Sequence, residues 1–361
     1  MERIAAAFAG VRRQLPHHHV SQYQGLLVWL CLLPHPLNHP RFAPLTSLKV
    51  SFFNTGLDDR FFHLISTACV HLTYLNLRHC TGLTDRALNS LATGCRRLTF
   101  LKLRCYQTDE VSDLGLDRLL TGCTRLRDLR VMGMQQQVRG WGFRAGRELE
   151  CLVVEECGAL DKNALAQGLR GKRLKRLSVM GMPFMGQGLE DVVVNEVEAE
   201  VVEELGLSAS GRLNDAGMDR IARACERLRV LEVRGMDDVT DHGWRSLAEH
   251  AQALEELDVR DCRLHEAGLR ALQRGCPRLR LLLLSDRIFK PCRSAALDSF
   301  CNARPGVTVQ VYASEEHYLV FENEGRLGRP AGRLGRRPTS HIDPIRFFKT
   351  LKFRYPIFRL L

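Results

Sequence analysis

The sequence predicts a single α/β solenoid, in which a concave parallel β-sheet is covered on its convex side by a row of helices. Three observations predict this fold. A leucine pattern, [LV]-x-x-L-x-[LV], occurs ten times, at intervals of 23–28 residues. Helical periodicity follows the pattern in the clear copies. Hydrophobic residues make up 45% of the 361 residues, enough for a continuous core. The copies begin at Leu45, Leu72, Leu98, Leu126, Leu149, Leu174, Val202, Leu228, Leu254 and Leu279.

Each unit is expected to begin with a short strand. In the copy LTYLNL, Leu75 and Leu77 alternate with polar or aromatic residues, among them Tyr74. Alternate side chains of a strand point to opposite faces, so the leucines are expected to enter the core and the others to face outward. We therefore expect one parallel strand per unit, at the leucine pattern.

A helix is expected to follow each strand. In TDRALNSLATGC, residues 84–95, apolar residues recur at helical spacing and Asp85 lies near the start. One strand–helix unit cannot bury its own apolar face, whereas stacked units bury a continuous core. A period of 20–29 residues with this leucine spacing is the signature of leucine-rich repeats. We expect a leucine-rich-repeat solenoid, or horseshoe, over residues 45–312.

Most of the 13 cysteines occupy two recurring positions of the unit, and we predict that they are buried, reduced and free of metal. The position near the strand end holds Cys80, Cys157 and Cys262 in three units and Met134, Met182 and Met236 in three others. Methionine would not complete a zinc site, so this is an apolar packing position. The helix-end position holds Cys69, Cys95, Cys123, Cys225 and Cys276. No paired C-x-x-C arrangement occurs, so no metal and no cofactor are expected.

The segments LTDRALNSLATGC, VTDHGWRSLAEHA and LNDAGMDRIARAC resemble the cysteine-containing class of leucine-rich repeats. That class is typical of F-box/leucine-rich-repeat proteins and of the related antagonist-of-mitotic-exit proteins. The resemblance is clearest in residues 72–125 and 203–278 and weakest in 126–200. It implies a protein–protein interaction module that serves as the substrate-recognition subunit of an SCF-type (Skp1–cullin–F-box) ubiquitin ligase. The alternative is a scaffold or antagonist that binds partners without recruiting a ligase.

The two ends of the chain depart from the repeat. Residues 1–44 contain Leu15-Pro16, the pair with which an F-box typically opens, but a later proline cluster would break a compact helical bundle. No F-box is recognisable, and this segment is either a diverged F-box or flexible. Its apolar run, GLLVWLCLL at 25–33, is too short to span a bilayer as a helix. Residues 313–361 hold ten basic and five acidic residues and are expected to form a flexible tail.

The net charge of +11 is concentrated at the ends, which carry +3 and +5 and leave +3 for the repeats. We therefore do not expect the repeats to bind nucleic acid, although the basic tail keeps a nucleic-acid-associated protein as a third interpretation. Reduced cysteines suit a cytoplasmic or nuclear protein. No G-x-x-x-x-G-K-[ST], H-E-x-x-H or G-x-S-x-G motif occurs, so no catalytic residue is expected and the protein is predicted not to be an enzyme.

Binding is expected on the concave face, where outward strand positions of neighbouring units align in columns. The candidate partner-binding residues are Tyr74, Arg78, Phe100, Lys102, Arg104, Arg130, Arg234 and Arg260. Aromatic residues and arginine are enriched in binding hot spots. Like charges that cluster in the first units cost stability, and an acidic or phosphorylated protein partner would offset that cost.

Overall fold

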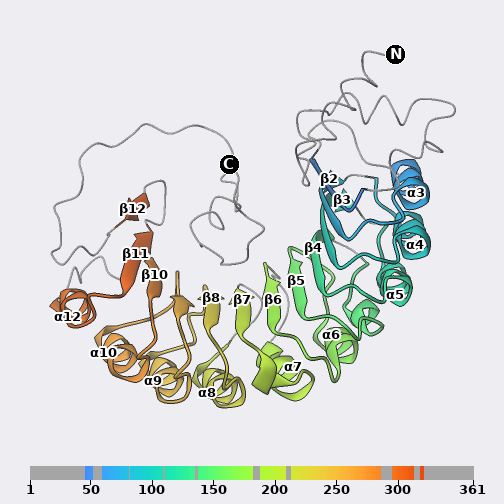
Figure 1. Ribbon diagram of the computed structural model, residues 1–361. Coiled ribbons are helices and arrows are strands. Elements are labelled where there is room, and N and C mark those ends of the chain that lie inside the picture. The colour runs from blue at the N-terminus through green and yellow to red at the C-terminus, as the bar shows by residue number, and fades with distance from the viewer. Residues whose placement is uncertain are drawn as a thin grey trace, which may run out of the picture.

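Twelve strands form one continuous, curved sheet in the computed structural model of the protein (Figure 1). The structure describes residues 45–320 except 52–58, 81, 109, 135–136, 182–187, 209–212, 286–294 and 313–317. Strands β1–β11 pair in chain order and in parallel, and helices cover the outer side of the curve. This arrangement confirms the predicted leucine-rich-repeat solenoid.

The bounds of the elements follow the predicted units. The strands are β1 (Ser47–Ser51), β2 (Tyr74–Cys80), β3 (Phe100–Thr108), β4 (Asp128–Met134), β5 (Cys151–Glu155), β6 (Arg176–Met180), β7 (Glu204–Ser208), β8 (Val230–Arg234), β9 (Glu256–Asp258), β10 (Leu281–Ser285), β11 (Thr308–Tyr312) and β12 (Tyr318–Val320). The helices are α3 (Asp59–Ala68), α4 (Asp85–Gly94), α5 (Asp113–Gly122), α6 (Lys162–Leu169), α7 (Leu189–Asn195), α8 (Asp215–Ala224), α9 (Asp241–His250), α10 (Glu266–Gly275) and α12 (Ala295–Ala303), with 3-10 turns η2 (Trp141–Phe143) and η3 (Ala199–Val201).

The core lies between the sheet and the helices and runs through all units. Leu75 and Leu77 of β2 and Leu88 and Leu91 of α4 are fully buried, as the two periodicities predicted. Each such leucine contributes about 1.5–3 kcal/mol on burial. The repeated inward leucines therefore hold the sheet in register and leave its other face to alternate side chains.

Aspartates at the helix starts join successive units. Asp215 of α8 accepts hydrogen bonds from the backbone N–H (2.7 Å) and hydroxyl (2.6 Å) of Thr240, which caps α9. It also accepts one from Gly243 N at 2.9 Å, where a Cβ atom would lie 2.6 Å from the Asp215 carboxylate. Asp85 contacts Ser112, the cap of α5, in the same way. In these helices the N-cap residue, Ser, Thr or Asn, caps the helix, and the aspartate after it links the unit to the next.

The seven cysteines predicted to be buried are buried, and Cys69 with them: Cys80, Cys95, Cys123, Cys157, Cys225, Cys262 and Cys276. None of these cysteines forms a disulfide. Met134 and Met236 are buried at the position equivalent to Cys80. In the helix-end row, the Cys123 thiol lies 3.5 Å from the carbonyl oxygen of Cys95 in the preceding unit. Burial raises the pKa of Cys123 to about 12, so this thiol stays protonated at neutral pH.

In two units that lack the helix-end cysteine, a basic side chain donates to carbonyl oxygens of the preceding unit. The shortened unit has η2 where a helix would be. In the next unit, Lys172 follows α6, and its Nζ donates to the carbonyl oxygens of Gly146 (2.8 Å) and Arg144 (3.2 Å). Burial lowers the pKa of Lys172 to about 8. After α12, the Arg304 guanidinium donates to the carbonyl oxygen of Cys276 at 3.0 Å. The donor row therefore continues through units in which the sequence resemblance is weak.

Alternating charges run along the strand starts of the later units. This row contains Arg127, Glu150, Lys175, Glu203, Arg229, Glu255 and Arg280. Glu150 forms ion pairs with Arg127 at 3.1 Å and with Lys175 at 2.8 Å, and Glu255 pairs with Arg229 at 3.1 Å. Exposed pairs of this kind contribute at most about 1 kcal/mol each. Their alternation keeps like charges from neighbouring one another along the edge.

The sheet extends into the C-terminal segment that the sequence analysis assigned to a flexible tail. There β12 pairs with β11 in the antiparallel direction, with Tyr318 opposite Tyr312. Residues 1–44, with the F-box question and the apolar run, lie outside the described residues. Within the described part of the chain, no helix combines the length and apolar character needed to cross a membrane.

Candidate protein-binding face

The outward side chains of the strands form three rows across the concave face. Strand register aligns Tyr74, Phe100 and Asp128 in the first row, Asn76, Lys102 and Arg130 in the second, and Arg78, Arg104 and Met132 in the third. These eight polar or aromatic residues of β2–β4, all except Met132, are termed the basic cluster. Their alignment is the one that the repeat period predicted.

An aromatic stack fixes one side of the basic cluster. The rings of Tyr74 and Phe100 lie 4.3 Å apart between centroids, with an angle of 9° between their planes. The Arg130 guanidinium lies 5.3 Å from the Phe100 centroid and donates two hydrogen bonds to Asp128, at 2.8 and 2.7 Å. Burial alone would lower the pKa of Arg130, but the hydrogen bonds and charge of Asp128 outweigh it and raise that pKa. Arg130 is therefore held in place by its own strand and by the ring.

Three further cations crowd beside this stack. Arg78 lies opposite Arg104 in the register of β2 and β3, and Lys102 lies between Asn76 and Arg130. Burial, and then the charge of Arg130, lower the pKa of Lys102 to about 8. Like charges on adjacent strands repel, so this arrangement is unfavourable for folding.

Asn76 adds an unsatisfied acceptor to the basic cluster. Its side chain is 6% exposed, and its Nδ2 donates to the Tyr74 hydroxyl at 3.3 Å. Its Oδ1 is buried and accepts no hydrogen bond from the described residues. A buried acceptor without a donor costs about 1–3 kcal/mol, which a bound N–H group would recover.

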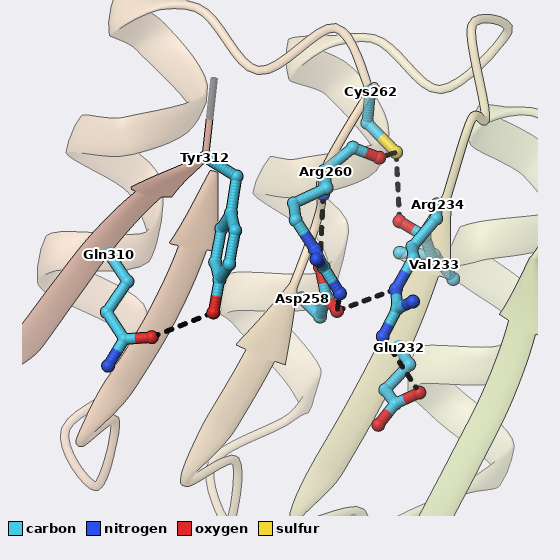
Figure 2. A network of polar contacts seen from close by, with 8 residues as sticks. All are labelled: Glu232, Val233, Arg234, Asp258, Arg260, Cys262, Gln310 and Tyr312. Atoms are coloured by element: carbon cyan, nitrogen blue, oxygen red, sulfur yellow. Dashed lines mark hydrogen bonds and ion pairs between the residues drawn. The ribbon is translucent and has the colours of Figure 1, made fainter. Parts of the chain in front are cut away.

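A second set of charges, termed the paired cluster, lies on β8–β11 (Figure 2). It consists of Glu232, Arg234, Asp258, Arg260 and Tyr312. Asp258, only 3% exposed, accepts hydrogen bonds from Arg234 Nε at 2.7 Å and from Arg260 Nε and Nη2 at 2.9 and 2.8 Å. Arg234 also lies 3.6 Å from Glu232, and the Arg260 guanidinium lies 4.5 Å from the Tyr312 ring centroid. These charges are therefore largely satisfied by one another.

Two carboxyl groups in this part of the concave face, those of Glu232 and Glu256, have raised pKa values and therefore ionise less readily than usual. Burial raises the pKa of Glu232, although Arg234 opposes the shift. Burial, and then the charge of Glu204, raise the pKa of Glu256. This half of the concave face therefore carries carboxylates and arginines together.

All eight predicted binding residues lie on the concave face, six in the basic cluster and Arg234 and Arg260 in the paired cluster. Their role in binding stays a prediction. Sequence reasoning missed that Asp128 holds Arg130 and that Asp258 holds Arg260. The signal is a D-x-R tripeptide that begins in a strand, because residues two apart in extended backbone share one face and can reach each other. It also missed Asn76 as an unsatisfied acceptor.

The described residues contain no group of three or more histidine, cysteine, aspartate or glutamate side chains able to hold a metal ion. The partly exposed side chains of the concave face are aromatic, cationic and carboxylate groups. Such groups are suited to contacts with another macromolecule.

Comparisons with known proteins agree with this architecture. A family model described as Leucine Rich repeat matches residues 68–92. A transport inhibitor response 1-like protein of Oryza sativa subsp. japonica is 30% identical over 155 residues, 42% of this chain and 24% of that protein. F-box/LRR-repeat protein 9 of Arabidopsis thaliana is 28% identical over 116 residues, 31% of this chain and 46% of that protein. A chain in the crystal structure of the Rad7 and Elc1 complex in yeast matches with a TM-score of 0.51 and 14% identity, and the match covers 87% of this chain and 90% of that chain.

These matches confirm the resemblance to the F-box/leucine-rich-repeat family. The chain folds as a leucine-rich-repeat solenoid, and the matches support a protein-interaction module. It spans about a quarter of one curated relative and less than half of the other. The structural match shows the fold alone.

Proposed function

We propose that the protein is the substrate-recognition subunit of an SCF-type ubiquitin ligase and that its concave face binds the protein substrate. The observation that carries the binding role is the basic cluster, which places crowded cations beside a fixed aromatic stack on an open face. The two curated relatives, one of them named as an F-box/LRR-repeat protein, support the ligase context.

In this proposal the two clusters have different roles. Arg78, Lys102 and Arg104 contact an acidic or phosphorylated segment of the substrate, because arginine can bind such groups with two hydrogen bonds. Tyr74 and Phe100 supply rigid apolar contact area beside them. Arg234 and Arg260 contribute at the far end of the face, where their bonds to Asp258 fix their positions.

A second candidate is a scaffold or antagonist that binds the same partner without a ligase. The proline cluster in residues 1–44 favours it, because a compact F-box is not recognisable there. Both candidates are non-enzymatic, need no cofactor, and place the protein in the cytoplasm or nucleus. The third interpretation, a nucleic-acid-associated protein, rests on the basic tail alone and would show as salt-dependent retention on nucleic acid.

Affinity purification of the tagged full chain, read by quantitative mass spectrometry, separates these candidates. We expect Skp1 and a cullin to be recovered together with a substrate. The substrate, but not Skp1, should be lost from the double variant Arg78→Glu/Arg104→Glu. Arg96→Glu/Arg97→Glu is the matched control, since these arginines lie exposed in the turn after α4. A retained substrate without Skp1 or cullin would instead establish the scaffold, and a substrate retained by the first variant would exclude the basic cluster as the interface.

A further inference from the structure

A short motif, C-x-R-L-R, joins a helix to the next strand in three units. The copies begin at Cys123, Cys225 and Cys276. In the first two copies, the second arginine forms an ion pair with a glutamate at the equivalent place in the following unit. Arg127 lies 3.1 Å from Glu150, and Arg229 lies 3.1 Å from Glu255. A negative group supplied by the following unit is therefore the usual partner of this arginine.

The third copy, which contains Arg280, is not followed by a glutamate. The register of β10 and β11 places Val307, a buried apolar residue, where the first two copies have their glutamate. Among the described residues, Arg280 forms an ion pair only with the preceding Glu255, at 3.8 Å, and its side chain is 76% exposed. Arg229 lies equally far from its own preceding acid, Glu203, and has its close pair in addition. Arg280 therefore makes the weaker of the motif's two contacts and lacks the closer one.

An open pocket of about 510 Å³ lies at this third copy. Its lining consists of Glu255, Pro277, Arg278, Leu279, Arg280, Arg304, Gly306 and Val307. A Cβ atom added at Gly306 would meet no other atom within 4 Å, so this side of the pocket is open. Small-molecule sites in proteins measure about 300–1,000 Å³. The pocket therefore has room for a small molecule at the place where the other copies hold a glutamate.

The lining of this pocket is cationic. Three arginines, Arg278, Arg280 and Arg304, accompany one carboxylate, that of Glu255. Both oxygens of Glu255 already accept hydrogen bonds from Arg229, at 3.1 and 3.2 Å. Neither Arg278 nor Arg304 forms an ion pair with a described residue. Backbone carbonyl oxygens of the turn after α10 accept hydrogen bonds from the Arg304 guanidinium, which fixes its position without neutralising its charge.

We infer that this pocket binds the phosphate group of a small phosphorylated molecule, with Arg278, Arg280 and Arg304 on the phosphate oxygens. A phosphate monoester carries about −1.5 to −2 charges at neutral pH and three strong acceptor oxygens, which suits three arginines better than one carboxylate does. Leu279 and Val307 give the rest of the molecule an apolar wall. The bound phosphate takes the place of the missing glutamate and links two units. The pocket lies at the strand starts, so this inference is independent of the proposed binding on the concave face.

Isothermal titration calorimetry of the full chain, in a phosphate-free buffer of low ionic strength at pH 7.5, tests the inference. The probes are phenyl phosphate, inorganic phosphate and benzoate. We expect phenyl phosphate to bind at least about tenfold more tightly than benzoate, because the phosphate group brings more charge and a third acceptor oxygen to the same ring. Phenyl phosphate should also bind more tightly than inorganic phosphate, because only the former can contact the apolar wall.

Two pairs of variants locate the binding. Arg278→Gln/Arg280→Gln should lower the affinity for phenyl phosphate at least about tenfold. The matched control, Arg125→Gln/Arg127→Gln, removes the arginines at the same places of the first copy and should change that affinity less than about twofold. Gly306→Asp places a negative charge on the open side of the pocket and should weaken binding, whereas the neutral Gly306→Asn should weaken it less.

Several results would overturn the inference. They are no measurable binding of any probe, benzoate or inorganic phosphate that binds as tightly as phenyl phosphate, and an affinity that survives Arg278→Gln/Arg280→Gln. An equal loss in both arginine double variants would also overturn it, because the arginines would then act only through the overall charge of the protein. Circular dichroism spectra of all variants show whether a loss of binding reflects a loss of folding.

Discussion

Two regions of the concave sheet use the same local arrangement in opposite ways. In both, an arginine lies over an aromatic ring and is held by the aspartate two residues before it: Arg130 by Asp128, and Arg260 by Asp258. In the paired cluster, Asp258 also holds the neighbouring arginine of β8. In the basic cluster, the neighbouring positions are cations on adjacent strands. The paired cluster ties two arginines to one buried carboxylate, whereas the basic cluster places cations side by side on adjacent strands.

This difference assigns the two clusters different roles: the paired cluster stabilises the fold, and the basic cluster is the candidate for binding. A charge network that closes on itself contributes to the fold and leaves little for a partner. Crowded cations and an unsatisfied acceptor cost stability, and proteins carry such costs mainly at functional sites. The basic cluster has both features, the lowered pKa of Lys102 and the buried Asn76 Oδ1. It is therefore the stronger candidate for the partner-binding surface.

The largest expected loss of stability comes from a substitution in the paired cluster. Asp258→Asn leaves two guanidinium groups without their shared carboxylate in a buried setting, and we expect it to lower the free energy of unfolding by about 3–5 kcal/mol. The matched variant Asp128→Asn affects one arginine. The Asp128 side chain is 23% exposed and that of Asp258 is 3% exposed, so we expect Asp128→Asn to lower the free energy of unfolding by only about 1–2 kcal/mol. Urea denaturation followed by circular dichroism measures both. Equal losses of unfolding free energy in the two variants would contradict the proposed difference between the clusters.

Replacing a cation by methionine should change the free energy of unfolding in opposite directions in the two clusters. Lys102→Met removes a half-buried charge that lacks a carboxylate at its side, and we expect it to raise the free energy of unfolding by about 1 kcal/mol at pH 7. Arg260→Met removes a charge that Asp258 needs and should lower it by about 2 kcal/mol. A loss of stability in Lys102→Met would mean that the basic cluster is as well satisfied as the paired cluster.

The gain in Lys102→Met should also depend on pH. The folded-state pKa of Lys102, about 8, is below its unfolded value, so the unfolded chain binds more protons between pH 8 and its ordinary pKa. The wild-type protein therefore gains stability relative to the variant as pH rises through this window. Urea midpoints at pH 7.5 and 10 should show the difference between the two proteins shrinking, and a constant difference would contradict the assignment.

The smallest expected difference concerns the cysteines, which are buried alike in both regions. Burial raises the pKa of Cys95 and Cys276 to about 12, so their thiolates are scarce at pH 8. Iodoacetamide should label both slowly in the native protein and rapidly after denaturation, with per-site rates read by mass spectrometry. Cys301, which is only half buried, should react faster. A fast helix-end cysteine in one region alone would show that the solenoid opens there.

Much of the fold followed from the sequence because two periods act together. Alternation along a strand decides which side chains face outward, and the repeat length decides which of them become neighbours. Leu75 and Cys95 were therefore predicted as buried, and Arg78 as a neighbour of Arg104, without knowledge of any contact. These features depend on backbone periodicity alone.

Other features depend on which donors and acceptors meet, which periodicity does not specify. Lys172 is buried close to the place of a helix-end cysteine because the carbonyl oxygens of Arg144 and Gly146, which follow η2, accept its hydrogen bonds. The partner of Arg130 is the aspartate of its own strand rather than a neighbouring acid, a choice set by side-chain geometry. β12 forms from a segment with tail-like composition, since an antiparallel edge strand needs only backbone hydrogen bonds.

The most direct test of the central claim is the titration of Lys102 by NMR on protein labelled with 13C-lysine, with Lys102→Arg for assignment. If the basic cluster is the surface that binds an acidic or phosphorylated partner, we expect Lys102 to titrate near pH 8 in the free protein. Its pKa should then rise when N-acetyl-O-phosphoserine N-methylamide is added, and Arg78→Glu/Arg104→Glu should suppress that rise. A Lys102 that titrates at its ordinary value of about 10.4, with and without the phosphoserine compound, would show that the cluster is ordinary solvated surface and would contradict the claim.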